Sequence, residues 1–356
     1  MELKSIRRIL VAPDKFKGTL TSQEAADIIS RELGLLLPDA EITIRCMADG
    51  GEGTAAIIAK ALGLERHTAA GHDALMRPAE IEYFTKGSVA VVDSAAVVGL
   101  AMLHGATYDP WLTSSEALGE FLMTMLQSGI EHIYVGVGGT ACSDAGIGML
   151  KALGMVYDEA AEVVDFSQCQ FDKLSTRITM LSDVDVPLLP DMDGAMSVLS
   201  FAPQKGFSSA DLPILEARIL KFYHAVERAL PSPGERHFEG AGGGIGYALA
   251  RVVSAKAALG ADILANIQGI TSESADLVVT GEGHFDRQSL HGKVAGTLIS
   301  RCAPTPVVVV CGKAEADVAT EAHVVETLPF VQGELTHAEA ERSLAEAMRH
   351  WIRTCS

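Results

Sequence analysis

The chain has 356 residues, of which 48% are hydrophobic and only 5% aromatic, and its formal net charge is −18. This length suggests two domains, and an apolar content dominated by aliphatic residues suits α/β layers better than an all-β sandwich. An acidic chain lacks the basic face that nucleic acids and anionic membranes attract, which argues against both as partners.

Six cysteines are scattered without paired spacing, so neither a disulfide framework nor a structural zinc site is expected. No apolar run approaches the roughly 20 residues of a membrane helix, and the run near the start is too short for a signal peptide. We therefore expect a soluble, cytoplasmic protein that does not bind a membrane.

The beginning of the chain alternates strands and helices. Residues 8–12 form an apolar run, and Thr21 or Ser22 caps a helix after the following loop. Residues 42–46 read as a second strand, and residues 54–62 as a second helix. Repeated strand–loop–helix units predict a parallel sheet.

The end of the chain has the same organisation. A strand over Leu277–Thr280 precedes a helix over residues 292–302, a buried strand over residues 306–312 and a closing helix over residues 338–352. These elements belong with those at the beginning of the chain in one parallel-sheet domain.

The middle of the chain differs, with a hairpin about Lys86-Gly87 and strands that end in glycines, acids and prolines. We predict an α/β fold with two domains. One is discontinuous, over residues 1–70 and 266–356, and the other is an inserted α/β domain over residues 71–265.

Glycine-rich loops follow most of the predicted strands. Ligands of open α/β sheets bind beyond the carboxyl ends of the strands, where helix N-termini offer unpaired amides. The clusters are "APDKFKGTL", "MADGGEGT", "GVGGTACSDAGIGML", "LSDVD", "FAPQKG", "GAGGGIG" and "VTGEGHFDRQSLHGK".

The third cluster formally matches a relaxed dinucleotide fingerprint, Gly136-x-Gly138-x-x-Ala141. A dehydrogenase of a small hydroxy acid is therefore one alternative, although no ribose-binding acid follows. A non-catalytic small-acid binding protein is another. The amides of Gly138, Gly139 and Thr140 can cradle a phosphate or a carboxylate in either case. No Walker A motif and no serine-hydrolase elbow is present.

Carboxylates and lysines accompany the glycines, and an anionic ligand among carboxylates needs a bridging cation. Mg²⁺ accepts carboxylate and phosphate oxygens together, and carboxylates, lysines and glycine-rich helix starts are the components of phosphoryl transfer. The candidate catalytic residues are Asp183, Asp286, Lys293 and Lys17, with Asp183 and Asp286 also as metal ligands. The candidate nucleotide-binding residues are Gly138, Gly139, Thr140, Asp144, Glu282 and Lys205.

Glu282 stands between two glycines directly after a predicted strand. We expect its carboxylate to be presented outward, on a backbone with φ > 0 on both sides. Gly281–Lys293 is then one face of the site, opposed by residues 14–18 or 138–144. The alternative is that Glu282 caps a helix and Asp286 faces solvent.

Taken together, the glycine clusters resemble bacterial-type (type 1) glycerate kinases. The matching segments are "VAPDKFKGTLTSQEAADII", "MADGGEGT", "GVGGTACSDAGIGMLKALG", "LSDVDVPL", "APQKG", "GAGGGIGYALA" and "DLVVTGEGHFDRQSLHGK", and they span Val11–Lys293 in the family's order. The resemblance implies ATP-dependent phosphorylation of D-glycerate, with the 2-phosphoglycerate product favoured over the 3-isomer. It also implies a flavodoxin-like domain beside a second α/β domain.

Within this resemblance, Lys17 and Lys293 hold phosphate or the glycerate carboxylate. Asp183 or Asp286 orients Mg²⁺ or takes the hydroxyl proton. The sequence departs from the family pattern at several positions. Lys15 stands where Ser is common, Thr140–Ser143 replaces "SATN", Ala145 replaces Gly, His284 replaces Arg and Ala295 replaces Pro.

Overall fold

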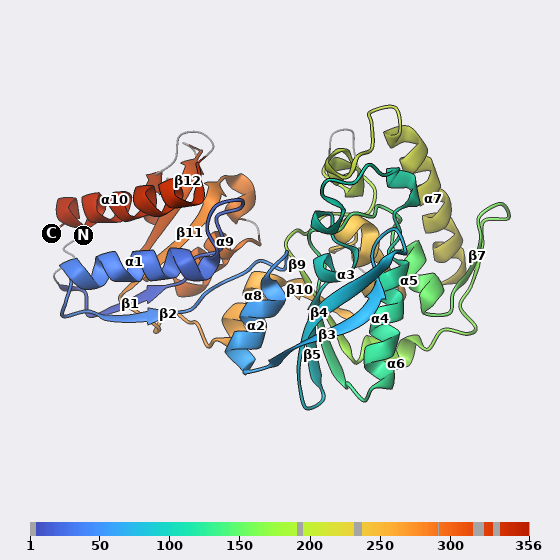
Figure 1. Ribbon diagram of the computed structural model, residues 1–356, viewed down its shortest axis with the longest axis horizontal. Helices are drawn as coiled ribbons and strands as arrows, with labels where there is room; N and C mark the ends of the chain where they lie inside the picture. Colours follow the sequence, from blue (N-terminus) through green and yellow to red (C-terminus); the bar gives the residue numbers. More distant parts are fainter. Residues whose placement is uncertain are drawn as a thin grey trace. The chain divides into compact units, whose positions relative to one another are not determined.

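The computed structural model describes residues 5–190, 195–230, 237–290, 292–315, 324–329 and 335–355. The chain forms two compact units (Figure 1). The first joins Met1–Asp49 to Gly260–Ser356, and the second is Gly50–Leu259. The sequence predicts an inserted domain over residues 71–265, whereas the second compact unit spans Gly50–Leu259. The boundaries lie earlier than expected, because residues 50–70 carry a helix and a strand that pack in the second unit.

The first unit is built on a five-stranded parallel sheet with the order β13-β12-β11-β1-β2. Numbered within the unit, this order reads 2-1-3-4-5 from the β2 edge, which is the flavodoxin-like arrangement. All of Val307–Cys311 in the described part of β12 is buried, as expected for a strand covered on both faces. The strands are β1 Arg8–Val11, β2 Glu41–Ile44, β11 Leu277–Phe285, β12 Val307–Ala314 and β13 Val324–Pro329.

Helices cover this sheet. Helices α1 and α10 lie side by side (Figure 1), while α9 packs on β11 and β12 and contacts α8. The Thr21 side chain accepts from the Glu24 amide, and Glu24 returns a carboxylate to the Thr21 amide, so α1 begins with the capping box of its sequence. The helices are α1 Ser22–Leu36, α8 Gly260–Ile267, α9 Val294–Cys302 and α10 His337–Cys355, with a 3-10 turn η8 at Arg287–Leu290.

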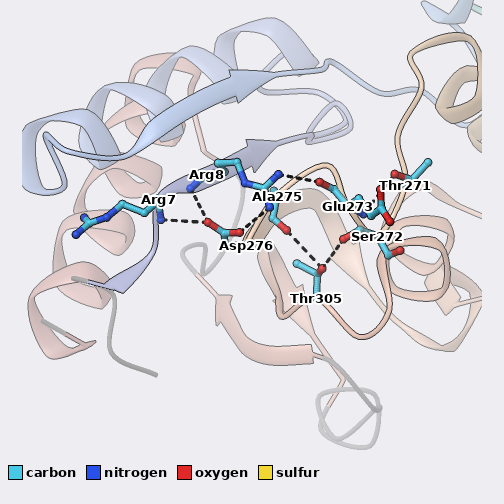
Figure 2. A network of polar contacts seen from close by, with 8 residues as sticks. All are labelled: Arg7, Arg8, Thr271, Ser272, Glu273, Ala275, Asp276 and Thr305. Atoms are coloured by element: carbon cyan, nitrogen blue, oxygen red, sulfur yellow. Dashed lines mark hydrogen bonds and ion pairs between the residues drawn. The ribbon is translucent and has the colours of Figure 1, made fainter.

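At the amino ends of this sheet, a polar network ties β1 to the segment before β11 (Figure 2). Asp276 accepts from the amides of Arg7 at 3.3 Å and Arg8 at 2.9 Å, and from Nη2 of Arg8 at 2.8 Å. Thr305 Oγ1 donates to the Ser272 carbonyl at 2.9 Å. Each carboxylate oxygen of Asp276 thus has a donor.

The second unit contains a mixed six-stranded sheet, ordered β10-β9-β6-β5-β4-β3. Four strands are parallel, and β4 and β3 complete the sheet as an antiparallel extension. The predicted hairpin about Lys86-Gly87 is confirmed, with Phe84 opposite Val91. The strands are β3 Glu65–His72, β4 Pro78–Lys86, β5 Val89–Asp93, β6 His132–Gly136, β9 Ile178–Ser182 and β10 Lys256–Leu259. A separate hairpin pairs β7 Val156–Asp158 with β8 Val163–Asp165.

The helices of this unit bury a large apolar core against the sheet, with Phe222 and Tyr247 among its fully buried side chains. They are α2 Thr54–Leu62, α3 Ala95–Val98, α4 Glu116–Gln127, α5 Ile147–Ala152, α6 Phe171–Ser175 and α7 Leu212–Ala229. Short 3-10 turns are η2 Ala101–Leu103, η3 Pro110–Leu112, η4 Val198–Phe201, η5 Pro203–Lys205 and η6 Ala241–Gly244, and η7 Tyr247–Val252 is a π-helix.

Helix 54–62 was predicted with the bounds that the structure shows. The strand predicted over residues 42–46 is instead Glu41–Ile44. The larger difference is β11, which runs past Thr280 to Phe285. Among the described helices, none combines the length and the apolar character needed to cross a membrane.

Candidate active site

Three acidic residues converge at the carboxyl ends of the first sheet. Strand β1 lies between β11 and β2, and parallel pairing continues past its end, since the Asp14 amide donates to the Gly281 carbonyl at 2.8 Å. Asp14 follows β1, Asp49 follows β2, and Glu282 lies in β11. Neighbouring parallel strands end at the same edge, so residues distant in sequence become neighbours there.

Burial and mutual repulsion dominate the electrostatics of this acidic cluster, which consists of Asp14, Asp49 and Glu282. Asp14 is 7% exposed, and burial together with the nearby Asp49 carboxylate raises its pKa well above the usual range, against the Lys15 amide that donates to it. Burial raises the pKa of Glu282 to about 7, against the attraction of Lys293. Oε1 of Glu282 is buried and has no hydrogen-bond partner among the described residues. The cluster therefore favours a proton or a cation.

The expectation for the backbone around Glu282 is wrong in two respects. Glu282 does not follow the strand but lies within it, opposite Cys311 of β12. Neither Gly281 nor Gly283 has a positive φ. Gly281 is instead required by close packing, because a Cβ there would lie 2.7 Å from the Val310 carbonyl oxygen. Glycine at position 281 therefore allows the hydrogen-bond ladder between β11 and β12 to continue where a side chain would clash with the Val310 carbonyl.

The loop after β1 lies beside this part of β11. A Cβ at Gly283 would lie 3.6 Å from the Lys17 amide nitrogen, so residues 14–18 flank β11 within the first unit. The Lys17 side chain is exposed. Its turn is held by a Thr19 amide bond to the Phe16 carbonyl at 2.8 Å, and His337 Nδ1 lies 2.7 Å from the Thr19 carbonyl oxygen. Helix α10 thereby anchors the turn that carries Lys17.

Asp286 and Lys293 lie beside the acidic cluster in the first unit. Oδ1 of Asp286 accepts from the amide of Ser289 at 3.0 Å and from its hydroxyl at 3.3 Å, and Oδ2 lies 3.7 Å from His284 Nδ1. Lys293 is the half-buried N-cap residue of α9. The positive charge of Lys293 lowers the pKa of Glu282, against the effect of burial. The ammonium group therefore lies near that carboxyl.

In the second unit, glycine loops pack backbone against backbone at the carboxyl ends of β5, β6 and β9. A Cβ at Gly138 would lie 2.7 Å from Cα of Gly51 and 3.2 Å from Oδ2 of Asp183, while Gly139 is exposed with φ +77°. Asp93 accepts from the amides of Gly53 at 2.8 Å and Ala55 at 3.0 Å, and so caps α2. Only glycine permits these approaches.

The fingerprint at Gly136 does not open a helix here. Residues after Gly138 form an irregular loop, and the next helix, α5, begins only at Ile147. A dinucleotide fold needs a helix N-terminus directly at the fingerprint. The geometry therefore does not support the dehydrogenase alternative.

The buried side chain of Lys205 holds the loop over residues 138–144 in place. It is 3% exposed, and its Nζ donates to the Cys142 carbonyl at 2.6 Å and to Thr140 Oγ1 at 3.2 Å. Burial lowers its pKa, against the negative charges of Asp144 and Asp183 among its neighbours. The lysine thus fixes Thr140 and places a positive charge beneath the loop.

Asp144, predicted as a nucleotide-binding residue, uses its oxygens within the fold. Oδ2 accepts from the Ser115 amide and hydroxyl at 2.9 and 2.8 Å and from the Gly148 amide at 3.0 Å, and Oδ1 accepts from the Gly146 amide at 3.1 Å. The Ser115 hydroxyl also accepts from the Met149 amide. The geometry gives Asp144 a positioning role for the loop before α5.

The two predicted metal ligands belong to different units, Asp286 to the first and Asp183 to the second. Within the described residues, no group of three or more His, Cys, Asp or Glu side chains is arranged to hold a metal ion. Magnesium sites commonly use one or two carboxylates together with substrate phosphates. The half-buried carboxylates of Asp183 and Asp286 are of that kind.

Sequence reasoning passed over Asp14, Asp93, Ser115 and His337. Asp14 stood within the quoted "APDKFKGTL" segment, and its position one residue after Pro13 at a strand end was the available signal. The roles of Asp93, Ser115 and His337 depend on segments far away in the chain, so no local pattern marks them.

Comparison with known proteins gives one consistent family. The family model described as the glycerate kinase family matches residues 9–355. The glycerate kinase of Neisseria meningitidis is 30% identical, covering 96% of this chain and 94% of its own, and the glycerate 2-kinase of Escherichia coli is 33% identical, covering 81% and 80%. A solved structure from Salmonella typhimurium, provisionally named glycerate kinase 2, aligns with TM-score 0.78 and 28% identity over 98% of this chain and 96% of its own.

Proposed function

We propose that this chain, which belongs to the glycerate kinase family and is therefore a kinase, transfers the γ-phosphate of ATP to D-glycerate and releases ADP. The observation that carries the proposal is the convergence of Asp14, Asp49 and Glu282 from three adjacent strands, beside Lys293. Phosphoryl transfer asks a protein mainly for positioning and charge compensation, and this arrangement offers both.

We assign a role to each candidate residue from its exposure and its hydrogen bonds. Lys17 is exposed and Lys293 half-buried, so each can reach a phosphate or the glycerate carboxylate. In the second unit, the exposed Gly139 and its neighbours present backbone amides to an anion, while Lys205 keeps Thr140 in place. Asp144 acts on ligands only through the loop that it holds.

Glu282 is the best placed general base. Its pKa of about 7 is close to working pH, where a base is most effective, and its Oε1 has no partner among the described residues. Of the two bases considered from sequence, Asp183 and Asp286, the latter already uses Oδ1 to accept from the amide and hydroxyl of Ser289. Glu282 therefore takes the proton from the glycerate hydroxyl as that oxygen attacks the γ-phosphate. We assign Lys293 to hold the charge that develops beside it.

We propose that Mg²⁺ is held by two carboxylates, one from each unit, and each of them suits this ion. Asp286 offers Oδ2 and Asp183 lies half-buried at a glycine loop, and both supply the hard oxygen ligands that this ion prefers. When bound, the ion neutralises phosphate charge and draws electron density from the transferred group. These two carboxylates remain the proposed ligands.

The 2-phosphoglycerate product is proposed over the 3-isomer on the strength of the resemblance, which includes a relative named glycerate 2-kinase. The test is an ADP-release assay with ATP, Mg²⁺ and a panel of three-carbon acids, followed by phosphorus NMR of the product. We expect D-glycerate to be the preferred acceptor and one phosphomonoester at carbon 2. ADP release that does not depend on any hydroxy acid would refute the kinase assignment to glycerate.

A further inference from the structure

The second unit contains a cavity far from its glycine loops. The cavity has a volume of about 370 Å³ and lies between the last turn of α4, the residue after α5, and α6 with the segment around it. Pockets for small ligands start at roughly 300 Å³. This space is therefore large enough for a compact organic molecule.

The lining combines an apolar wall with cationic groups. Leu126, Leu153 and Leu174 line it, and the last two are almost completely buried. The polar lining consists of three glutamines, Lys173 and Arg177. Such a mixture of an apolar surface and a few polar groups is typical of small-molecule sites.

Charge makes the cavity unusual in this protein. The whole chain carries a net charge of −18, yet among the described side chains none that lines this cavity is an aspartate or a glutamate. Among the described side chains, Lys173 Nζ donates to Gln170 Oε1 at 2.9 Å, and neither Lys173 nor Arg177 forms an ion pair. Arginine is the side chain best suited to a carboxylate or phosphate group. The cavity is thus complementary to an anion with an apolar body.

The cavity is distinct from the proposed active site. Arg177 directly precedes β9, and its carbonyl accepts from the Ile133 amide at 2.7 Å at the start of β6. Asp183 follows the same strand at its other end. The five residues of β9 lie between the two positions, which places them about 20 Å apart at the usual rise per residue. A ligand in this cavity does not compete for the glycine loops.

Two helices connect the cavity to those loops. Helix α4 reaches from Leu126 at the cavity to its N-cap residue Ser115, which donates to Asp144. Helix α5 ends next to Leu153 and begins after Gly146, whose amide also donates to Asp144. The cavity thus adjoins the C-terminal ends of α4 and α5. The N-terminal ends of the same two helices contact Asp144.

We propose that this cavity is a second ligand site, which binds a small organic anion with one carboxylate or phosphate group on an apolar body of a few carbons. Arg177 and Lys173 bind the anionic group, and Leu126, Leu153 and Leu174 contact the body.

Isothermal titration calorimetry on the full chain tests this site, with hexanoate and hexyl phosphate as probes and hexanol and acetate as controls. We expect one of the two anions to bind with one site per chain, and the comparison of the two identifies the preferred head group. Hexanol lacks the charge and acetate lacks the body, so both should bind at least tenfold more weakly.

Variants locate the binding. Arg177→Gln and the exposed Lys173→Gln should each weaken binding of the preferred anion about tenfold, while Lys151→Gln, an exposed lysine on α5 outside the cavity, should leave it unchanged. Glycerate phosphorylation without the probe should be the same in all three. Absence of binding by both anions, or equal binding by the wild type and both cavity variants, overturns the proposal and leaves the assignment as a kinase untouched.

Discussion

The pKa values of carboxylates are shifted in opposite directions at the two ends of the first unit's sheet. At the amino end, Asp276 receives hydrogen bonds from Arg8 and from two backbone amides, and the Arg8 hydrogen bond lowers its pKa (Figure 2). At the carboxyl end, burial raises the pKa of both Asp14 and Glu282, and Oε1 of Glu282 has no donor within the described chain. The same parallel sheet carries an acid with matched donors at one end and, at the other, buried acids whose pKa is raised, one of them with an oxygen that has no partner among the described residues.

This difference separates structural from functional charge. A carboxylate with matched donors adds to stability, whereas a buried carboxylate without them costs stability and persists where activity requires it. At the amino end, the hydrogen bonds of Asp276 hold β1 to the start of β11. At the carboxyl end, the buried acids can bind a proton, a cation or a substrate. Each experiment below perturbs one end and leaves the other as its control.

Removal of the divalent cation should have the largest effect. The loop carboxylates and the ATP phosphates have the same sign, so a chelator is expected to reduce phosphoryl transfer to background, and excess Mg²⁺ should restore it. The amino-end network contains no proposed ligand, and the midpoint of thermal unfolding without nucleotide should hardly move. Full turnover in excess chelator would contradict the assignment of Asp183 and Asp286.

Glu282→Gln should lower kcat by about 100- to 10,000-fold, the usual contribution of a general base. The amide keeps the shape of the side chain but cannot take a proton. Because the variant also removes a buried ionisable acid, its thermal stability near neutral pH should equal or exceed that of the wild type. A variant with kcat near the wild-type value would move the base to Asp14 or Asp286.

Lys293→Ala should lower kcat/KM by about 100-fold, the loss typical of removing one preorganised donor, with little loss of stability. Lys313→Ala is the matched control, because Lys313 is an exposed lysine on the neighbouring strand β12. The ADP-release assay and thermal unfolding are measured on both variants. Equal activity of the two would show that Lys293 is only a solvated helix-start residue.

The pH dependence should report on Glu282. Its pKa is raised from 4.5 to about 7 in the folded chain, so the stability that its protonated form contributes is complete below pH 4.5 and is lost as the pH rises through 7. The wild type should therefore lose stability relative to Glu282→Gln over this interval. The wild-type kcat/KM should rise roughly tenfold per pH unit below 7 and then level off. If the free energies of unfolding of the wild type and of Glu282→Gln changed with pH in parallel, the raised pKa of Glu282 would be excluded.

Asp276→Asn should have the smallest effect and only on stability. The lowered pKa of Asp276 means that its stabilising contribution is present above its ordinary pKa and is lost as the pH falls below it. Near neutral pH the variant should unfold at a slightly lower temperature, because the side chain is solvent-accessible and its ion pair with Arg8 is screened. Activity should be unchanged. A large loss of activity would show that the two ends are coupled.

Much of the local structure followed from sequence patterns. The Thr21 capping box, helix 54–62 and the hairpin at Lys86 have signals within a few residues, and the structure contains all three. The run "VVTGEG" was harder, because its glycines suggested the end of a strand. The ladder to β12 extends β11 through them, and that partner lies far away in the chain.

The sequence by itself determined the α/β class, the family and most of the loops at which acids, lysines and glycines gather, because those depend on residue types and short spacings. Only the tertiary structure decided which carboxylates are buried, which donors they have and which loops they share. In the sequence, Glu282 stands between two glycines and Asp144 stands two residues before Gly146. Glu282 lies buried with an oxygen that has no partner in the described part of the chain, and Asp144 receives four hydrogen bonds, because burial and hydrogen bonding depend on neighbours that the chain supplies from elsewhere.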